Sequence, residues 1–408
     1  NVTAENAAAL EAQLAALGEA LAALSEEQYA QLDMTRYEAL CEAMNELTAE
    51  QENGHSHPIC GATHTNIGDH EGDCADVTWT AWDGVNEITY DSETKTAYVY
   101  LTGNAERDST LTVAKGCTLY LCLNGYSITK TTQDRDDFDG VIMINDGGTL
   151  SLCDCNGSSA GNGKITHAKD KIGRGVRVGD GTSGNGIPTF NMFGGEISGN
   201  HAGETTDKQK QDGAGVHMQG GNFNMYGGKI TDNYVDVAHN YGGGGVCMSG
   251  GSFTMYDGEI SGNTSAKYGG GVAVTYSASF VMQGGTISGN KAATDGGGVY
   301  IYNGTFTLSD KAIITGNTAT SGNGGGVYYR GYSSSHSMTV SGSAKIEKNN
   351  AANGGGIYVE DVGSGKANLT GGNISENNAG SNGGGIYVSA GDLNLSGNAT
   401  ITQNTATT

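Results

Sequence analysis

The feature that most constrains the fold of this chain is a short motif, GGGV or a close variant, that returns throughout its second half. The apolar residue after the glycines recurs at intervals of 30, 26, 27, 28, 30 and 29 residues. These anchor residues are Val216, Val246, Val272, Val299, Val327, Ile357 and Ile386. A nearly constant interval of this length is typical of a chain built from stacked copies of one supersecondary unit.

Each unit carries two further marks, a short apolar segment such as FNM, FTM, FVM or FTL, and an isoleucine three residues before an asparagine. Each unit therefore has three short strands with a side-chain period of two, separated by turns of Gly, Asn and Ser. The units contain no helical pattern of the length that a βαβ crossover needs. The sequence predicts a mainly β fold, a right-handed parallel β-helix with three short strands per coil, over residues 85–408.

The recurring asparagine has a physical reason in such a coil. A buried Asn amide can satisfy backbone groups that a tight turn leaves unpaired, and it can also bond to the Asn of the coils above and below. We expect a structural ladder, with no catalytic role, formed by Asn200, Asn233, Asn263, Asn290, Asn317, Asn349, Asn377 and Asn404. The glycines before each anchor fit positions of positive φ or of close approach between coils.

Composition excludes several classes of function. The 408 residues carry a formal net charge of -23, which repels phosphate backbones and anionic lipid surfaces, so we expect no nucleic-acid partner. No run of about 18 apolar residues exists, so we expect no direct membrane insertion. With 69 Gly but only 2 Pro, and no repeating Gly triplet, the chain is neither collagen-like nor Pro-rich and disordered.

The chain before the repeats divides into two parts. Residues 1–52 are rich in Ala, Leu and Glu with apolar residues at helical spacing, which predicts a small helical module. Residues 53–84 form a Cys- and His-rich segment that we interpret as a metal knuckle or a disulfide-closed loop. Its candidate zinc ligands are His57, Cys60, His64, His70 and Cys74, with His55 as a substitute. A Cys60 to Cys74 disulfide and unconnected side chains are the alternatives.

Two further groups of residues could form sites within the first coils. Aligning TLYLC on TLSLC places Cys122 and Cys153 one coil apart, close enough for a disulfide or for two packed thiols. The loop TTQDRDDFDG holds Asp134, Asp136, Asp137 and Asp139, which offer enough oxygen for Ca²⁺. Because the spacing lacks the EF-hand glycine and terminal Glu, we favour a solvated acidic loop over a calcium site.

The segments CTLYLCLNGYSIT, GGGVYI, GTFTLSD and ITGN, with HSHPIC and WTAWD upstream, resemble the large secreted or cell-wall β-helix proteins of gut Firmicutes. They are similar, more loosely, to polymorphic outer-membrane-protein and autotransporter adhesin repeats. The resemblance implies a secreted or cell-surface adhesin of a Gram-positive bacterium that binds host glycans or glycoproteins, with immunoglobulin or mucin among the partners.

The residue after each anchor faces outward, and in the last coils it is always aromatic: Tyr300, Tyr328, Tyr358 and Tyr387. We expect an exposed tyrosine stripe that stacks on sugar rings or anchors a protein, although aromatic stacking along a sheet is also stabilising in itself. The main alternative is a polysaccharide lyase or glycoside hydrolase. The outward acids are scattered over different coils, so we expect no enzyme. A structural stalk is the third reading.

Overall fold

The structure is a computed structural model that describes residues 79–136, 139–155, 163–180, 186–207, 211–236, 241–360 and 365–407. Several predictions concern residues outside these ranges. They are the helical module over residues 1–52, the ligands His57, Cys60, His64, His70 and Cys74, and one member of the acidic loop, Asp137. Among the described residues, no helix is long and apolar enough to cross a membrane.

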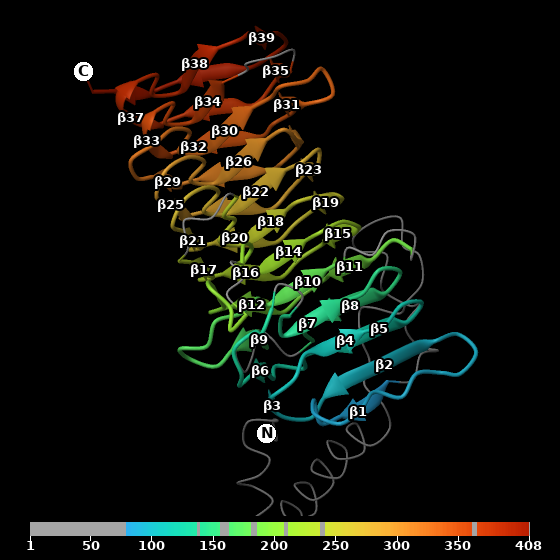
Figure 1. The fold of residues 1–408 in the computed structure, drawn as a ribbon. Helices are drawn as coiled ribbons and strands as arrows, with labels where there is room; N and C mark the ends of the chain where they lie inside the picture. The colour runs from blue at the N-terminus through green and yellow to red at the C-terminus, as the bar shows by residue number, and fades with distance from the viewer. Residues whose placement is uncertain are drawn as a thin grey trace, which may run out of the picture.

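The chain winds into a right-handed parallel β-helix, which confirms the predicted fold. Its strands form four sheets, here called sheets 1 to 4 in the order in which a coil visits them, and all pairings between the strands of the described ranges are parallel. Figure 1 shows the coils stacked from β1 at one end to β38 and β39 at the other. The first strand of the stack, β1, lies before residue 85, where the sequence placed the start of the β-helix.

Sheets 1 and 2 carry the FTM-type and the isoleucine segments of the repeat. Sheet 1 contains β1 (Thr80–Trp82), β2 (Thr96–Leu101), β5 (Thr118–Cys122), β8 (Thr149–Cys153), β11 (Thr189–Met192), β15 (Asn222–Met225), β19 (Ser252–Met255), β23 (Ser279–Met282), β27 (Thr305–Leu308), β31 (Ser337–Val340), β35 (Lys366–Leu369) and β39 (Leu393–Leu395). Sheet 2 contains β3 (Ala105–Arg107), β6 (Ile128–Lys130), β9 (Lys164–His167), β12 (Glu196–Ser198), β16 (Lys229–Thr231), β20 (Glu259–Ser261), β24 (Thr286–Ser288), β28 (Ile313–Thr315), β32 (Lys345–Glu347), β36 (Asn373–Ser375) and β40 (Thr400–Thr402).

Sheets 3 and 4 follow the asparagine and the glycines. Sheet 3 contains β13 (His201–Ala202), β17 (Tyr234–Val235), β21 (Thr264–Ser265), β25 (Lys291–Ala292), β29 (Thr318–Ala319), β33 (Asn350–Asn353), β37 (Asn378–Asn382) and β41 (Thr405–Ala406). Sheet 4 contains β4 (Leu111–Val113), β7 (Ile142–Ile144), β10 (Val176–Val178), β14 (Val216–Met218), β18 (Val246–Met248), β22 (Val272–Thr275), β26 (Val299–Tyr302), β30 (Val327–Arg330), β34 (Ile357–Glu360) and β38 (Ile386–Ala390).

Sheet 3 is the part of the coil that the sequence pattern did not show. Most of its strands have only two residues, as in Thr264–Ser265, so they are too short to show a period of two. They form because the residue after each ladder asparagine continues in extended conformation and pairs with its equivalent one coil away. A coil thus has the three predicted strands and a fourth short one.

Equivalent residues stack on one another inside the coils. Val299 and Ile301 point inward with Phe306 and Ile314, as the alternation predicts, and all four are 0 % exposed. The inward phenylalanines of sheet 1 form a column whose ring centroids are 4.4 to 5.2 Å apart, made of Phe190, Phe223, Phe253, Phe280 and Phe306. Burial of each such side chain contributes about 1.5–3 kcal/mol relative to exposure.

The predicted asparagine ladder is present in the structure. In Asn263, for example, Nδ2 donates to the Ile230 carbonyl at 2.8 Å and to Asn290 Oδ1 at 2.9 Å. The same pattern repeats from Asn200 to Asn404, with Nδ2 to Oδ1 distances of 2.9 to 3.0 Å. Each Oδ1 also accepts from the backbone N of the preceding ladder residue. The ladder therefore fixes the spacing of the coils at the corner between sheets 2 and 3.

The glycine triplets permit close approach between coils. A Cβ added to Gly297 would lie 2.5 Å from both the Gly325 carbonyl oxygen and the Thr318 carbonyl carbon. Real Cβ atoms do not approach backbone this closely, so only Gly fits here. The first glycine of that triplet, Gly296, has φ +68, the left-handed conformation in which a side chain is strained.

Candidate functional site

The predicted tyrosine row is present as a stack, but it is not an exposed stripe. Successive ring centroids from Tyr300 through Tyr328 and Tyr358 to Tyr387 are 5.1, 5.3 and 5.5 Å apart. Tyr300 is only 6 % exposed and Tyr328 only 4 %, whereas Tyr358 and Tyr387 are half-buried. The expectation of exposure is therefore wrong for the first two tyrosines.

Two sets of contacts explain this burial on the outer side of sheet 4. The ring of Tyr268 stacks on Tyr300 at 4.5 Å and Tyr328 stacks on its other face, so only the edges of the Tyr300 ring remain. The backbone of Gly296 lies so close that a Cβ there would be 2.7 Å from the Tyr300 Cβ. Tyr268 can lie over the sheet because its own coil has the small residue Ala273 at the outward position.

A partly exposed cluster, here called the tyrosine-arginine patch, lies beside this stack and consists of Tyr302, Arg330, Tyr332 and Glu360. Tyr302, Arg330 and Glu360 are the last residues of the adjacent strands β26, β30 and β34. The Arg330 guanidinium carbon is 5.0 Å from the centre of the Tyr332 ring and 5.9 Å from that of Tyr302. Arg330 Nη1 is 3.7 Å from Glu360 Oε1, and Tyr332 is 41 % exposed.

A strained, exposed tyrosine precedes the patch by one coil. Tyr276 follows β22 with φ 51 and is 54 % exposed, while its ring contacts Tyr241 edge to face at 4.8 Å. A bulky residue at positive φ is uncommon and costs about 1–2 kcal/mol. Thr275, the residue before it, pairs with Tyr302, so Tyr276 belongs to the same sheet edge as the patch.

The electrostatics around the patch keep the adjacent Tyr328 phenol neutral. Burial raises the pKa of Tyr328, and its Oη donates a hydrogen bond to Glu360 Oε2, which raises the pKa further. Burial alone would lower the pKa of Arg330, but Glu360 and the neighbouring tyrosines raise it. Burial raises the pKa of Asp295, and the Glu360 charge adds to this, although hydrogen bonds from Asn323 oppose it. The patch therefore presents a cation, two phenol groups and the Glu360 carboxylate together, with the Asp295 carboxyl nearby.

A second cluster, of buried charges, lies at the N-terminal end of the asparagine ladder. Asp134 Oδ1 is 2.8 Å from Lys130 Nζ and 3.0 Å from His167 Nε2, and Asp134 is 0 % exposed. Burial alone would raise the Asp134 pKa, but His167 and Lys130 lower it to about 2. His167 N donates to the first ladder oxygen, Asn200 Oδ1, at 3.1 Å. His167 thus joins the Lys130–Asp134 ion pair to the first residue of the asparagine ladder.

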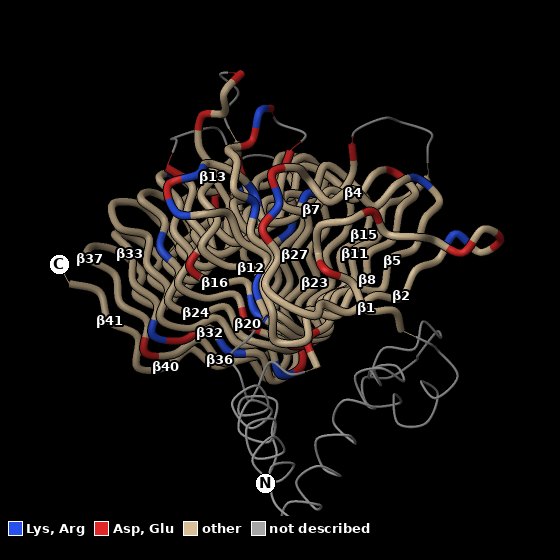
Figure 2. The backbone as a smooth tube through the Cα atoms, turned by 90° about the horizontal axis from the view of Figure 1, so that it is seen from below, with Lys and Arg blue, Asp and Glu red and all other residues tan. Residues whose placement is uncertain are grey.

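This cluster fixes the long loops that lead into sheet 4 in the first coils. Asp134 Oδ2 accepts from Arg174 N at 3.0 Å and from Gln211 Nε2 at 3.1 Å, which joins three loops at one carboxylate. Farther along, Arg177 Nη1 lies 2.7 Å from His217 Nδ1. Burial lowers the pKa of His217, and the charges of Arg174 and Arg177 lower it further. Figure 2 shows charged residues gathered in loops near β13, whereas the walls of the coils are mostly uncharged.

The acidic loop is organised by protein cations. Lys130 Nζ lies 2.9 Å from Asp139 Oδ1 as well as 2.8 Å from Asp134, and the Arg135 guanidinium is 3.3 Å from Asp136. The structure therefore pairs Asp134 and Asp139 with a lysine ammonium, and Asp136 points to a different partner.

Cys122 and Cys153 are aligned in neighbouring strands of sheet 1, as the sequence predicts. Both side chains are thiols in the structure, and neither sulfur belongs to a disulfide. A third thiol, that of Cys155, lies in the same group. Cys155 was not among the predicted site residues, although the CDC pattern in TLSLCDC was a usable signal.

Sequence reasoning also missed the patch and the buried charges. In the segments ITK and ITH, Lys130 and His167 stand two residues after the isoleucine, where later coils continue as ISGN or ITGN. This departure from the repeat motif was the available signal for the buried ionic cluster. Arg330 stands in β30 as the last arginine of the chain, between two tyrosine-containing segments, which was the available signal for the patch. Neither signal shows which groups meet, because the contacts join different coils.

Comparison with known proteins supports the architecture. Residues 200–343 match a family model described as a right handed beta helix region, which spans the coils from β13 to β31. No curated protein and no solved structure matches the chain. Together with the observed coils, the match identifies a β-helix repeat protein.

Proposed function

We propose that this protein is a carbohydrate-binding surface module, and that the tyrosine-arginine patch takes the sugar rings of a glycan or glycoprotein. The observation that carries the proposal is Arg330, which lies over the rings of Tyr302 and Tyr332. This contact holds the three side chains in a defined arrangement before any ligand arrives. Such pre-organisation lowers the entropy that binding would otherwise cost.

The chemistry of the patch suits a neutral sugar. An exposed tyrosine face such as that of Tyr332 can cover the apolar face of a pyranose ring. Arg330 and Glu360 supply a donor and an acceptor for hydroxyl groups at the edge of the ring. The net charge of -23 disfavours strongly anionic ligands, since long-range repulsion slows their approach.

The proposal includes a location and a partner class. We place the protein outside the cell, secreted or attached to the cell wall of a Gram-positive gut bacterium, and we propose a non-enzymatic, adhesin-like role toward host glycans or glycoproteins such as mucin or immunoglobulin. A rigid stack of coils would hold the patch at a constant distance from the neighbouring coils, which suits binding to an extended or repeated ligand.

A glycan array, followed by titration of the best ligand against the full chain, tests the proposal. Tyr332→Ala should weaken binding roughly 5- to 30-fold, since such stacking contributes about 1–2 kcal/mol. Tyr234→Ala is the matched control, because Tyr234 is 42 % exposed but belongs to β17 in sheet 3. Equal affinity of Tyr332→Ala and the parent chain for every glycan bound would refute the assignment of the patch.

One observation favours cleavage of a polysaccharide as a second candidate. Burial raises the pKa of Asp295, which suits a general acid, and the Glu360 carboxylate lies close enough to add to this rise. Incubation of the chain with uronans, pectin and mucin glycans would distinguish the two roles. Reducing ends or unsaturated products that disappear in both Asp295→Asn and Glu360→Gln would favour the enzyme, and intact glycans favour the binding module.

A further inference from the structure

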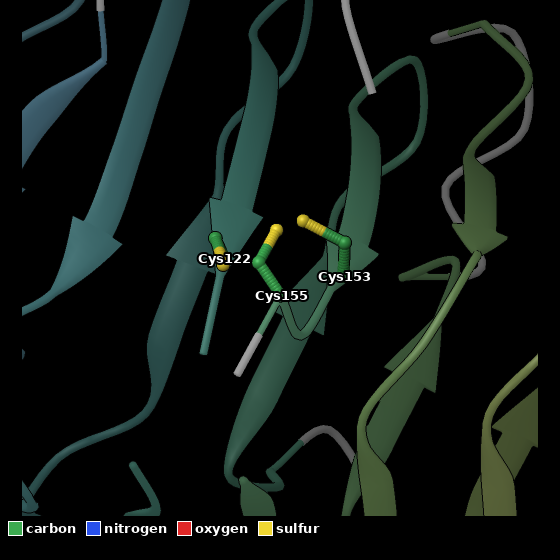
Figure 3. A group of neighbouring side chains, drawn as sticks. All are labelled: Cys122, Cys153 and Cys155. Carbon is green, nitrogen blue, oxygen red and sulfur yellow. The ribbon is translucent and has the colours of Figure 1, made fainter. Parts of the chain in front are cut away.

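Three cysteine side chains converge on the outer side of sheet 1. Cys122 ends β5 and Cys153 ends β8, and the two residues are direct partners in the parallel register. Cys155 follows two positions later in the turn, and the three sulfurs all lie within 4.8 Å of one another. Figure 3 shows the Cys153 and Cys155 side chains pointing toward each other, with Cys122 on the adjacent strand.

The turn that carries Cys155 is held in place by the residue between the two cysteines. Asp154 Oδ1 accepts from Gly125 N at 2.6 Å, and its Oδ2 accepts from Gly163 N at 2.6 Å. Gly125 belongs to the turn between β5 and β6 of the preceding coil, and Gly163 ends the connection between β8 and β9 that also carries Cys155. The position of Cys155 relative to Cys153 is therefore set by a bonded turn and does not depend on a contact between the sulfurs.

The surroundings of the sulfurs are apolar and aromatic. Cys122 and Cys153 are 0 % and 2 % exposed, in a cluster with Trp79 and Tyr100 that is separate from the main core. Cys155 is half-buried and so gives the group one side that solvent reaches. A shell of this kind excludes competing water ligands while leaving one route of entry.

We propose that Cys122, Cys153 and Cys155 form a binding site for a thiophilic metal ion, with Zn²⁺ as the ion of choice. An ion with three sulfur ligands at about 2.3 Å places the sulfurs about 3.8–4.0 Å apart. The observed limit of 4.8 Å needs only a small contraction to reach that geometry. Thiolate is the ligand that selects zinc and other soft ions over Ca²⁺ or Mg²⁺.

Binding exchanges protons for the metal. In the apo protein burial raises the pKa of Cys153, as do the neighbouring thiols, and contact with Cys122 raises the pKa of Cys155. Each thiol that becomes a ligand gives up its proton as its S–Zn bond forms, so Zn²⁺ uptake releases protons. The Asp154 charge, which disfavours a thiolate without metal, favours the bound cation.

The test uses the full chain, reduced, stripped with a chelator and kept free of oxygen. After dialysis against Zn²⁺, metal analysis should find one more Zn²⁺ per chain in the parent than in Cys155→Ser. Any Zn²⁺ bound by residues 53–84 is the same in both chains and cancels in this difference. Cys117→Ser is the matched control, since Cys117 is also half-buried but packs against the main core. Co²⁺ should give a sulfur-to-metal charge-transfer band that loses intensity in Cys155→Ser and in Cys122→Ser but not in Cys117→Ser.

A measurement on the parent chain alone guards against variants that do not fold. Zn²⁺ should slow alkylation of Cys155 at least tenfold, mapped by mass spectrometry, and leave the alkylation of Cys117 unchanged. Two results would overturn the proposal. One is equal metal content in the parent chain and Cys155→Ser with no protection of Cys155. The other is a disulfide between any two of the three cysteines in protein isolated with its thiols blocked, which would assign the group to redox closure.

Discussion

Replacing one asparagine inside the ladder tests how the coils are held together. In Asn263→Ala the side chain loses two donated bonds, to the Ile230 carbonyl and to Asn290 Oδ1. It also loses two accepted bonds, from the backbone N and the Nδ2 of Asn233, both at 3.0 Å. Asn233 Nδ2 keeps its bond to the Ile197 carbonyl and Asn290 Oδ1 keeps the bond from the backbone N of residue 263, but the four lost bonds all lie in a corner where Asn263 is 0 % exposed.

The expected cost follows from these four contacts. Each net hydrogen bond contributes about 1 kcal/mol, and each buried partner left unsatisfied costs about 1–3 kcal/mol. We therefore expect Asn263→Ala to reduce the free energy of unfolding by about 4 kcal/mol. Asn404→Ala is the matched variant at the end of the ladder, where the residue is half-buried and water can replace the lost bonds. Its cost should be about 1 kcal/mol.

The assay is urea unfolding followed by circular dichroism, with hydrogen exchange to locate the weakened coils. Exchange should rise in β16, β20 and β24 for Asn263→Ala, because a repeat protein loses stability near the altered coil. Equal midpoints for Asn263→Ala and Asn404→Ala would refute the reasoning, since the ladder bonds would then contribute nothing beyond what water offers.

Three further outcomes follow from the buried charges and the glycine turns, each checked by unfolding midpoints. The Asp134 pKa lies at about 2, below its value in the unfolded chain, so the stability that this carboxylate contributes is present above about pH 4 and is lost as the pH falls through 2. In Asp134→Asn this contribution to the fall in stability at acid pH should be absent. The lowered His217 pKa means that only the unfolded chain takes up this proton near pH 6.5, so stability should fall on acidification below that value, and less so in His217→Gln. Gly297→Ala should cost about 3 kcal/mol or more because its Cβ would meet backbone, whereas Gly289→Ala, with φ +62 and open space, should cost about 1 kcal/mol.

The sequence determines the repeated part of the fold because each coil contains the same marks. Val299, Phe306 and Asn317 occupy the inward and ladder positions that their spacing predicts. A period of two assigns a residue to one side of a strand, and this was enough for the core. It was not enough for sheet 3, whose two-residue strands leave no period to detect.

The candidate site was harder to predict because it depends on contacts between coils. Alternation correctly placed Tyr300 on the outer side of its strand, but it cannot show that Tyr268 and the Gly296 turn cover that side. The exposed aromatic groups proved to be neighbours such as Tyr332, which lies in a turn with no repeat signal. Likewise, Asp134 was interpreted as a surface acid, because its partner His167 comes from the next coil.

Pulsed electron paramagnetic resonance tests the central claim, that equivalent residues of successive coils lie one above another in parallel register. Spin labels on genetically encoded residues, which leave the cysteines untouched, would be placed at Asn191 and at one of three partners on the outer side of sheet 1: Thr307, Asn368 or Asn394. With strands about 4.8 Å apart, four, six and seven steps along the sheet predict distances of about 19, 29 and 34 Å. Distances that fail to increase along this series would contradict the stacked coil and the site built on it.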